Sequence, residues 1–231
     1  MATMLITGAN RGLGLDFCRQ YAQDNWQVIA CCRQPQNATE LNQLAVQHTN
    51  VSVFALDMDD FSQIEQLAVT LSDISIDVLL NNAGVYGDDA AHRFGNLDYQ
   101  TWQHTLSTNV FAPVKMIETF LPHVARSEQK KVVAMSSLMG SIADNTSGGS
   151  ILYRSSKSAL NAAMKSIAIE LQAKHIAVLI LHPGWVRTDM GGSNAPMEIP
   201  QSVSHMRENI ANFTLAQTGE FQRYDGKVLP W

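Results

Sequence analysis

The stretch Thr7-Gly8-Ala9-Asn10-Arg11-Gly12-Leu13-Gly14 connects an opening apolar run to a helical pattern. A phosphate group can approach backbone N–H groups at a helix N-terminus only where bulky side chains do not obstruct it, and glycines provide such a turn. The glycine spacing differs from the G-x-G-x-x-G dinucleotide fingerprint, although the physical role can be the same. The stretch predicts a nucleotide-binding strand–turn–helix unit. A purely structural turn is the alternative.

Short apolar runs and helical patterns alternate from this turn to the end of the chain. The order is typical of βαβ units that form a parallel sheet covered on both faces. The predicted strands are Thr3–Thr7, Gln27–Cys32, Val51–Ala55, Asp77–Leu80, Lys131–Ser136, Ile176–Leu181 and Lys227–Leu229. The predicted helices are Gly12–Asp24, Thr39–Gln47, Phe61–Ser72, Tyr99–Ala125, Arg154–His175 and Gln201–Thr214. We expect one α/β domain over residues 1–231, a doubly wound Rossmann fold with a seven-stranded, mostly parallel sheet.

Two features of this pattern locate a site. Pro113 falls inside the fourth predicted helix and predicts a bend or a break there. Three loops, Gly84–Asp98, Leu138–Leu152 and Trp185–Pro200, each follow the C-terminal end of a predicted strand. Ligands bind at that edge of an open parallel sheet, so the three loops are expected to surround the site.

The composition limits the classes of function. A net charge of −5 gives no electrostatic reason to expect nucleic acid or an anionic membrane as partner. The longest apolar runs are far shorter than a membrane span, and the N-terminus lacks the features of a signal peptide. Of three cysteines, Cys31 and Cys32 are adjacent; a redox pair is the alternative to the expected pair of buried thiols. The expected compartment is a reducing cytoplasm.

Tyr153 and Lys157 are four residues apart in a predicted helix and therefore share one helix face. A neighbouring ammonium favours the phenolate and lowers the pKa of the phenol. The pair is therefore expected to exchange protons near neutral pH. An exposed Tyr/Lys pair on a solvated helix is the alternative.

Two arginines bear on the nucleotide. The second predicted strand ends without the carboxylate that would bind a free adenosine ribose, and Arg33 follows it instead. Arg11 lies in the glycine turn, and two guanidinium groups can bind a phosphate. The pattern favours NADP(H) over NAD(H), with solvated surface charges as the alternative.

Taken together, the motifs closely resemble the short-chain dehydrogenase/reductase family, and specifically its branch of C-factor and sniffer-like carbonyl reductases. The resemblance extends over essentially the whole chain in order. The motifs that carry it are Thr7-Gly8-x-x-x-Gly12-x-Gly14, Asn81-Asn82-Ala83-Gly84, Asn109, Ser136-Ser137, Tyr153-x-x-x-Lys157 and Pro183-Gly184-x-x-x-Thr188.

The resemblance implies the role of each site residue. Tyr153 would be the general acid, Lys157 would lower its pKa and hold the nicotinamide ribose, and Ser137 would bind the substrate oxygen, with Ser136 as second choice. Asn109 would hold a water that links Lys157 to solvent. The implied cofactor-binding residues are Gly8, Asn10, Arg11, Gly12, Leu13, Gly14, Arg33, Asp57, Asn81, Ala83, Gly84, Tyr153, Lys157, Pro183, Gly184, Val186 and Thr188.

Two of these assignments carry a qualification. For Asp57, which matches an adenine contact, a helix N-cap is the alternative. Ser137 and Tyr153 are sixteen residues apart, where many family members have thirteen. The extra residues lie in the Gly/Ser-rich stretch Asp144–Ser150, and we expect the site geometry to survive them.

The resemblance also implies the activity, which is NADPH-dependent reduction of a ketone, aldehyde or dione. The substrate would be small to medium in size and apolar, and no metal would take part. The expected pocket residues are Tyr86, Phe94, Met139, Trp185 and Met190. The alternatives are a coenzyme-binding signalling protein of C-factor type with incidental turnover, and an alcohol dehydrogenase that works in the oxidative direction. By analogy we expect a homodimer or homotetramer.

Overall fold

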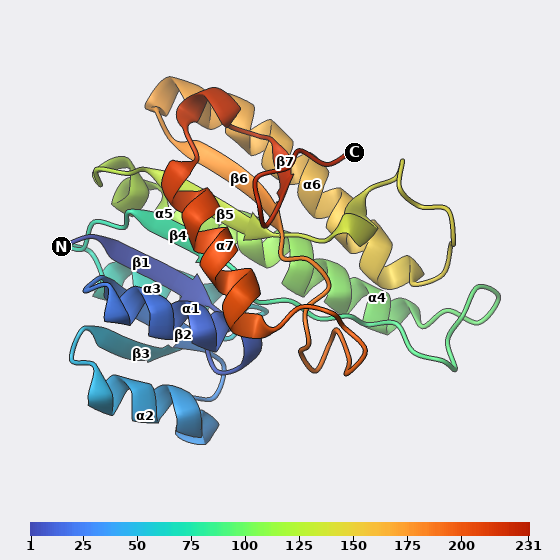
Figure 1. Cartoon of the computed structure of the whole chain (residues 1–231), viewed down its shortest axis with the longest axis horizontal. Helices are drawn as coiled ribbons and strands as arrows, with labels where there is room; N and C mark the ends of the chain where they lie inside the picture. Colours follow the sequence, from blue (N-terminus) through green and yellow to red (C-terminus); the bar gives the residue numbers. More distant parts are fainter.

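One seven-stranded sheet runs through the computed structural model, which describes residues 1–231 (Figure 1). All six neighbouring strand pairs are parallel, in the order β3-β2-β1-β4-β5-β6-β7. The strands are β1 (Thr3–Thr7), β2 (Gln27–Cys32), β3 (Val51–Ala55), β4 (Val78–Asn81), β5 (Lys131–Met135), β6 (Ala177–His182) and β7 (Phe221–Arg223). The direction of winding reverses between β1 and β4, as in a doubly wound nucleotide-binding fold, and the predicted fold class is confirmed.

Helices cover both faces of the sheet. They are α1 (Gly12–Gln23), α2 (Thr39–Gln47), α3 (Phe61–Thr70), α4 (Tyr99–Leu106), α5 (Ala112–Ala125), α6 (Ile151–Leu171) and α7 (Ile199–Asn212). In Figure 1, α1 and α7 lie in front of the sheet, and their apolar residues join those of α2 in one core cluster. Residues of α3, α5 and α6 form the cluster on the opposite face.

The five inner strands, β1, β2, β4, β5 and β6, are almost entirely buried, which explains their nearly continuous apolar sequences. Adjacent residues Cys31 and Cys32 belong to opposite core clusters, because successive side chains of a strand point to opposite faces. Both thiols and that of Cys18 are free and buried, and burial raises the pKa of each. The buried thiols expected from the sequence are confirmed, and an adjacent redox pair does not fit this geometry.

The predicted helix Tyr99–Ala125 is interrupted. A π-helical segment, Ser107–Phe111, separates α4 from α5, and Pro113 lies in the first turn of α5. Pro113, which cannot donate a backbone hydrogen bond, follows directly on the segment where the regular α-helical bonding is replaced by π-helical bonding. The irregularity predicted at Pro113 is therefore present as a change of winding, and the helical residues run on without a gap. Asn109 lies in the π-helical turn, a feature often found at functional sites.

The last predicted strand, Lys227–Leu229, is wrong. Strand β7 is instead Phe221–Arg223, whose Phe221 is buried and pairs with Ile180 of β6. Val228 is exposed and makes only an isolated antiparallel bridge to Gln222 across a turn. The apolar residues Val228 and Leu229 favoured the wrong segment. Strand β7 contains two polar residues, Gln222 and Arg223, and so shows no apolar run that would predict a strand.

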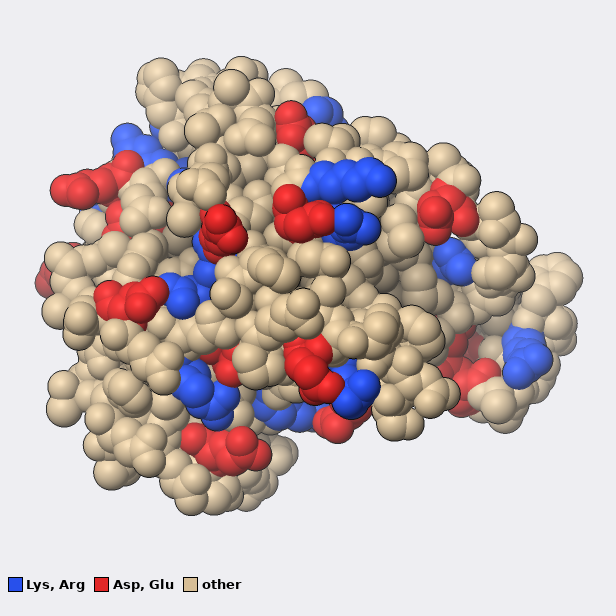
Figure 2. Space-filling view, viewed as in Figure 1, with Lys and Arg blue, Asp and Glu red and all other residues tan.

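Charged residues of both signs are interspersed on the face shown in Figure 2, and neither sign covers a large continuous area there. No helix is long and apolar enough to cross a membrane. No group of three or more His, Cys, Asp or Glu side chains is arranged to hold a metal ion.

Candidate active site

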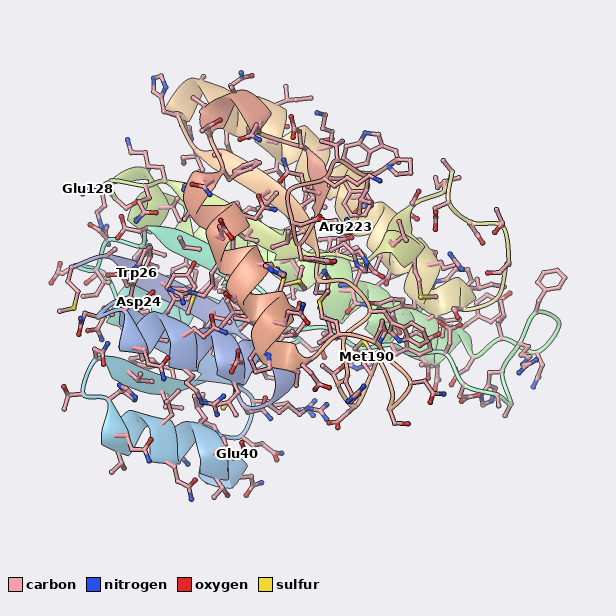
Figure 3. All side chains as sticks on the ribbon, viewed as in Figure 1. Asp24, Trp26, Glu40, Glu128, Met190 and Arg223 are labelled. Carbon is pink, nitrogen blue, oxygen red and sulfur yellow. The ribbon has the colours of Figure 1, made fainter.

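A cleft of about 1370 Å³ lies at the C-terminal ends of the strands. The glycine turn, the loops after β3, β4 and β5 and the loop after β6 line it. Figure 3 shows Met190 of the last of these loops on this side of the sheet, whereas Asp24 and Trp26 lie at the opposite end. The three loops predicted to surround the site all contribute to the cleft.

The glycine turn is built for close approach of the backbone. A Cβ atom on Gly14 would lie 2.1 Å from the carbonyl oxygen of Gly8, and one on Gly8 would lie 2.9 Å from Cα of Ala83. Gly8 also has a positive φ of 67°, which L residues rarely adopt. The turn brings the N-terminus of α1 to the cleft without side chains in the way, so the residues present fit a dinucleotide pyrophosphate.

Hydrogen bonds tie the turn after β4 to this glycine turn. The Thr7 hydroxyl accepts from the backbone N–H groups of Asn82 at 3.1 Å and Ala83 at 3.0 Å. The Asn82 amide donates back to the carbonyl oxygens of Thr7 at 2.9 Å and Gly8 at 3.2 Å. These bonds fix two walls of the cleft relative to each other. Asn82 belongs to the motif Asn81-Asn82-Ala83-Gly84, but the sequence analysis did not include it among the site residues.

Tyr153 and Lys157 meet in the cleft, in the first two turns of α6. The Nζ atom of Lys157 lies 5.7 Å from the centre of the Tyr153 ring and donates to the carbonyl oxygen of Met135 at 2.8 Å. Burial lowers the pKa of Lys157 to about 8. Burial raises the pKa of Tyr153 to about 12, although a hydrogen bond with Ser137 opposes the rise.

The predicted lowering of the Tyr153 pKa is therefore wrong in direction. The spacing of the two residues shows that they are neighbours but not that both are buried, and burial disfavours the charged forms of both. A phenol with a raised pKa keeps its proton at neutral pH.

The two serines after β5 differ in their partners. The Ser136 hydroxyl donates to the Asn161 Oδ1 atom at 2.5 Å and is buried. The Ser137 hydroxyl accepts from the backbone N–H of Met139 at 3.2 Å, and it lies close enough to Tyr153 to lower the pKa of the phenol. Ser136 is thus engaged by Asn161, whereas Ser137 acts on Tyr153. The exposed loop Asp144–Gly149 contains the three extra residues, and Ser137 and Tyr153 both still line the cleft.

Asn109 lies behind the cleft wall rather than in it. Its Oδ1 atom accepts from the backbone N–H of Val85 at 2.9 Å, and its Nδ2 atom donates to the carbonyl oxygen of Val85 at 2.8 Å and to the hydroxyl of Ser156 at 2.9 Å. A Cβ atom on Gly84 would lie 3.1 Å from this Oδ1 atom and 3.5 Å from Nζ of Lys157. Asn109 therefore joins the loop after β4 to the helix that carries Tyr153 and Lys157.

Four of the five predicted pocket residues line the cleft: Tyr86, Met139, Trp185 and Met190. Phe94 does not line it. Phe94 is 90% exposed in the loop between β4 and α4, so the prediction that it belongs to the pocket is wrong. An apolar residue in a loop beside the cleft does not by itself show that its side chain reaches the cleft.

Three charged residues predicted to contact the nucleotide also line the cleft: Arg11, Arg33 and Asp57. Arg33 is exposed after β2, and Arg11 forms an ion pair with Asp189. The N-cap of α3 is Asp60, whose carboxylate accepts from the backbone N–H groups of Ser62 and Gln63. The N-cap alternative for Asp57 is thereby excluded.

Most predicted cofactor residues line the cleft, and Asn81 is the exception: it is buried, while Asn82 takes the place beside the cleft. His182 lines the cleft as well, and burial lowers its pKa to about 4, so it is neutral at physiological pH. The cleft residues that were predicted are Gly8, Asn10, Arg11, Gly12, Leu13, Gly14, Arg33, Asp57, Ala83, Gly84, Ser137, Tyr153, Lys157, Pro183, Gly184, Val186 and Thr188.

Known proteins share the sequence pattern and the fold of this chain. The model of the family described as short chain dehydrogenase matches residues 2–199. The carbonyl reductase Sniffer of D. melanogaster superposes with a TM-score of 0.92 at 37% sequence identity, and all of both chains is covered.

Two further proteins are similar. The NADPH-bound carbonyl reductase from chicken fatty liver superposes with a TM-score of 0.91 at 30% identity, covering 100% of this chain and 99% of the other. The C-signal of Myxococcus xanthus is 39% identical over 156 residues, which cover 68% of this chain and 93% of that protein.

Proposed function

Because the chain belongs to the short-chain dehydrogenase family, we propose that it is an NADPH-dependent carbonyl reductase in which Tyr153 donates the proton. The substrate is a small to medium ketone, aldehyde or dione with an apolar body, in keeping with Tyr86, Met139 and Met190 in the cleft. One observation carries the proposal. A protonated phenol, a serine hydroxyl and a lysine ammonium meet at the cleft whose other end is the glycine turn.

Three residues have different roles in the proposed reduction. When bound, the nicotinamide of NADPH would supply the hydride for the carbonyl carbon. Ser137 lines the cleft together with Tyr153 and would hold the substrate oxygen beside the phenol. Tyr153 gives its proton to that oxygen as negative charge develops, and the ammonium of Lys157 stabilises the phenolate that remains.

The proposal is tested by following NADPH absorbance with a panel of ketones, aldehydes and diones. We expect turnover with at least the apolar members of the panel. A protein that binds NADPH but oxidises none of it across the panel would contradict the proposal. The reverse reaction, alcohol oxidation with NADP⁺, uses the same residues, and the two directions are compared in one assay.

The serine is tested by a pair of variants. Ser137→Ala is expected to lower kcat about 10²-fold, since the carbonyl oxygen loses a placed donor. The matched Ser136→Ala change breaks the hydrogen bond to Asn161 and is expected to cost about 1 kcal/mol of stability with a smaller effect on kcat. The opposite ranking of the two kcat values would show that Ser136 holds the substrate.

Coenzyme preference is tested at Arg33. Arg33→Ser is expected to raise the KM for NADPH about 10–100-fold, because a charge-assisted phosphate contact is lost. The KM for NADH serves as the internal control and is expected to stay within about threefold, since that coenzyme lacks the phosphate. A wild-type enzyme that prefers NADH, or an equal rise for both coenzymes, would contradict this role.

A second candidate function is signalling, in which coenzyme binding matters and turnover is incidental. The 39% identity to the C-signal of Myxococcus xanthus favours it. A pure sensor has no need for a proton donor buried beside a lysine, so the site geometry favours the reductase.

We further propose that the enzyme acts in the cytoplasm as a homodimer or homotetramer. The three free thiols suit a reducing compartment. Tyr99 of α4 and Phe111 of the π-helical turn expose 67% and 55% of their surface and support association through this region. Sedimentation of the purified protein as a monomer would contradict the proposed assembly.

A further inference from the structure

The helix that carries Tyr153 begins without a cap of its own. Ser150, which precedes α6, has a left-handed backbone with φ 46° and makes no side-chain capping bond. The first N–H groups of a helix have no acceptor within the helix and need one from elsewhere. Asp88, in the loop after β4, supplies it: Oδ1 accepts from Leu152 N at 3.2 Å and Oδ2 accepts from Tyr153 N at 2.8 Å.

The same loop also contacts the Tyr153 side chain. The ring of Tyr86 lies against the ring of Tyr153, with 4.9 Å between centres and 37° between planes. The Tyr86 hydroxyl is 2.6 Å from the Ser150 hydroxyl oxygen. The segment Tyr86–Asp88 therefore holds Tyr153 by its backbone, by its ring and through Ser150.

This segment is itself fixed by rigid elements. Gly87 has a positive φ of 77°, and a Cβ atom there would lie 2.2 Å from the Oγ1 atom of Thr105, which is fully buried in α4. One residue before Tyr86, both polar backbone atoms of Val85 are bonded to Asn109. Tyr86 thus lies between two fixed residues, and Asp88 directly follows the second of them.

We propose that Asp88 is a positioning residue for the reduction, which fixes the phenol of Tyr153 by capping the first turn of α6. The inference rests on the proposed function, in which Tyr153 is the proton donor. Asp88 does not line the cleft, so it acts through Tyr153 and not on the substrate. Displacement of a reacting group by about 1 Å can cost about 10²-fold in rate, so the loss of two bonds to this turn is expected to be visible in kcat.

The test is Asp88→Ala in the full-length enzyme. We expect kcat to fall about 10–100-fold while the KM for NADPH stays within about twofold. The deuterium isotope effect on kcat, measured with NADPH deuterated at the transferred position, is expected to rise, since chemistry becomes slow relative to coenzyme release. Asp88→Asn keeps one acceptor oxygen and places an NH₂ group against the other backbone N–H. Its kcat is therefore expected to lie between that of the wild type and that of Asp88→Ala.

The matched control is Asp60→Ala, which removes the N-cap of α3 in the same way. Each alanine variant is expected to lose about 2–4 °C of Tm. Only Asp88→Ala should change the isotope effect, because a less stable enzyme still contains folded molecules with the wild-type rate-limiting step.

A kcat and isotope effect for Asp88→Ala that match those of Asp60→Ala would overturn the proposal. Should Asp88→Ala fail to fold, the same comparison with Asp88→Asn decides it. Tyr153→Phe is measured alongside. If that variant remains active the proposed function itself fails, whereas an inactive Tyr153→Phe with an unaffected Asp88→Ala removes the positioning role alone.

Discussion

Tyr153→Phe is expected to lower kcat about 10²–10⁴-fold, because the change removes the only proton that the phenol can donate and leaves the ring in place. The ring remains packed against Tyr86, with 4.9 Å between the ring centres in the wild-type structure. The KM and the dissociation constant for NADPH are therefore expected to change little. Steady-state assays combined with NADPH fluorescence titration measure both quantities.

The control for this change is Tyr86→Phe, which loses the hydroxyl bonded to Ser150 and keeps the aromatic contact. We expect its kcat to remain well above that of Tyr153→Phe. Activity of Tyr153→Phe within about tenfold of wild type, less than a general acid normally contributes, would show that the proton comes from another group.

Lys157→Met is expected to lower kcat about 10²-fold, since the phenolate that forms at Tyr153 loses the adjacent ammonium, and to change the stability as well. The same change is expected to stabilise the fold. Burial lowers the pKa of Lys157 from 10.5 to about 8, which corresponds to roughly 3 kcal/mol against the charged form. Loss of the bond to Met135 offsets part of this, so a net gain of about 1–2 kcal/mol at pH 7 is expected.

The stabilisation has a defined pH dependence. Between pH 8 and pH 10.5 the unfolded wild-type chain keeps the proton of Lys157 while the folded chain loses it, so the free energy of unfolding of the wild type rises with pH across this window. The advantage of Lys157→Met is therefore expected to be full below pH 8 and to shrink above it. Urea unfolding at pH 7 and pH 9.5 measures the difference. A variant that is less stable than the wild type at pH 7 would contradict the assignment of burial as the cause.

The first six strands could be predicted to within one residue, because each is a mainly apolar run that is followed by a turn and later by a helical pattern. Strand β7 could not, since Gln222 and Arg223 interrupt its apolar pattern. The glycine turn was predictable for a physical reason: Gly14 stands where a Cβ atom would meet a backbone oxygen.

Two kinds of feature could not be predicted from the sequence: the burial of individual side chains, and contacts between residues far apart in the chain. The spacing of Tyr153 and Lys157 predicted that they meet, but the burial that raises one pKa and lowers the other depends on elements far away in the chain. The predicted helix began at Arg154, whereas α6 begins at Ile151. The cap that starts it comes from Asp88, which is 64 residues before Leu152 and lies in a loop with no helical pattern.

Transfer of deuterium tests the central claim most directly. NADPH deuterated at C4 is mixed with the wild-type enzyme and with Tyr153→Phe, together with the carbonyl panel, and the alcohol products are examined by mass spectrometry and NMR. We predict one deuterium on the carbinol carbon of the wild-type product and almost no product from Tyr153→Phe. Tight binding of NADPH without deuterium in any product would contradict the account and favour a coenzyme-binding signalling protein.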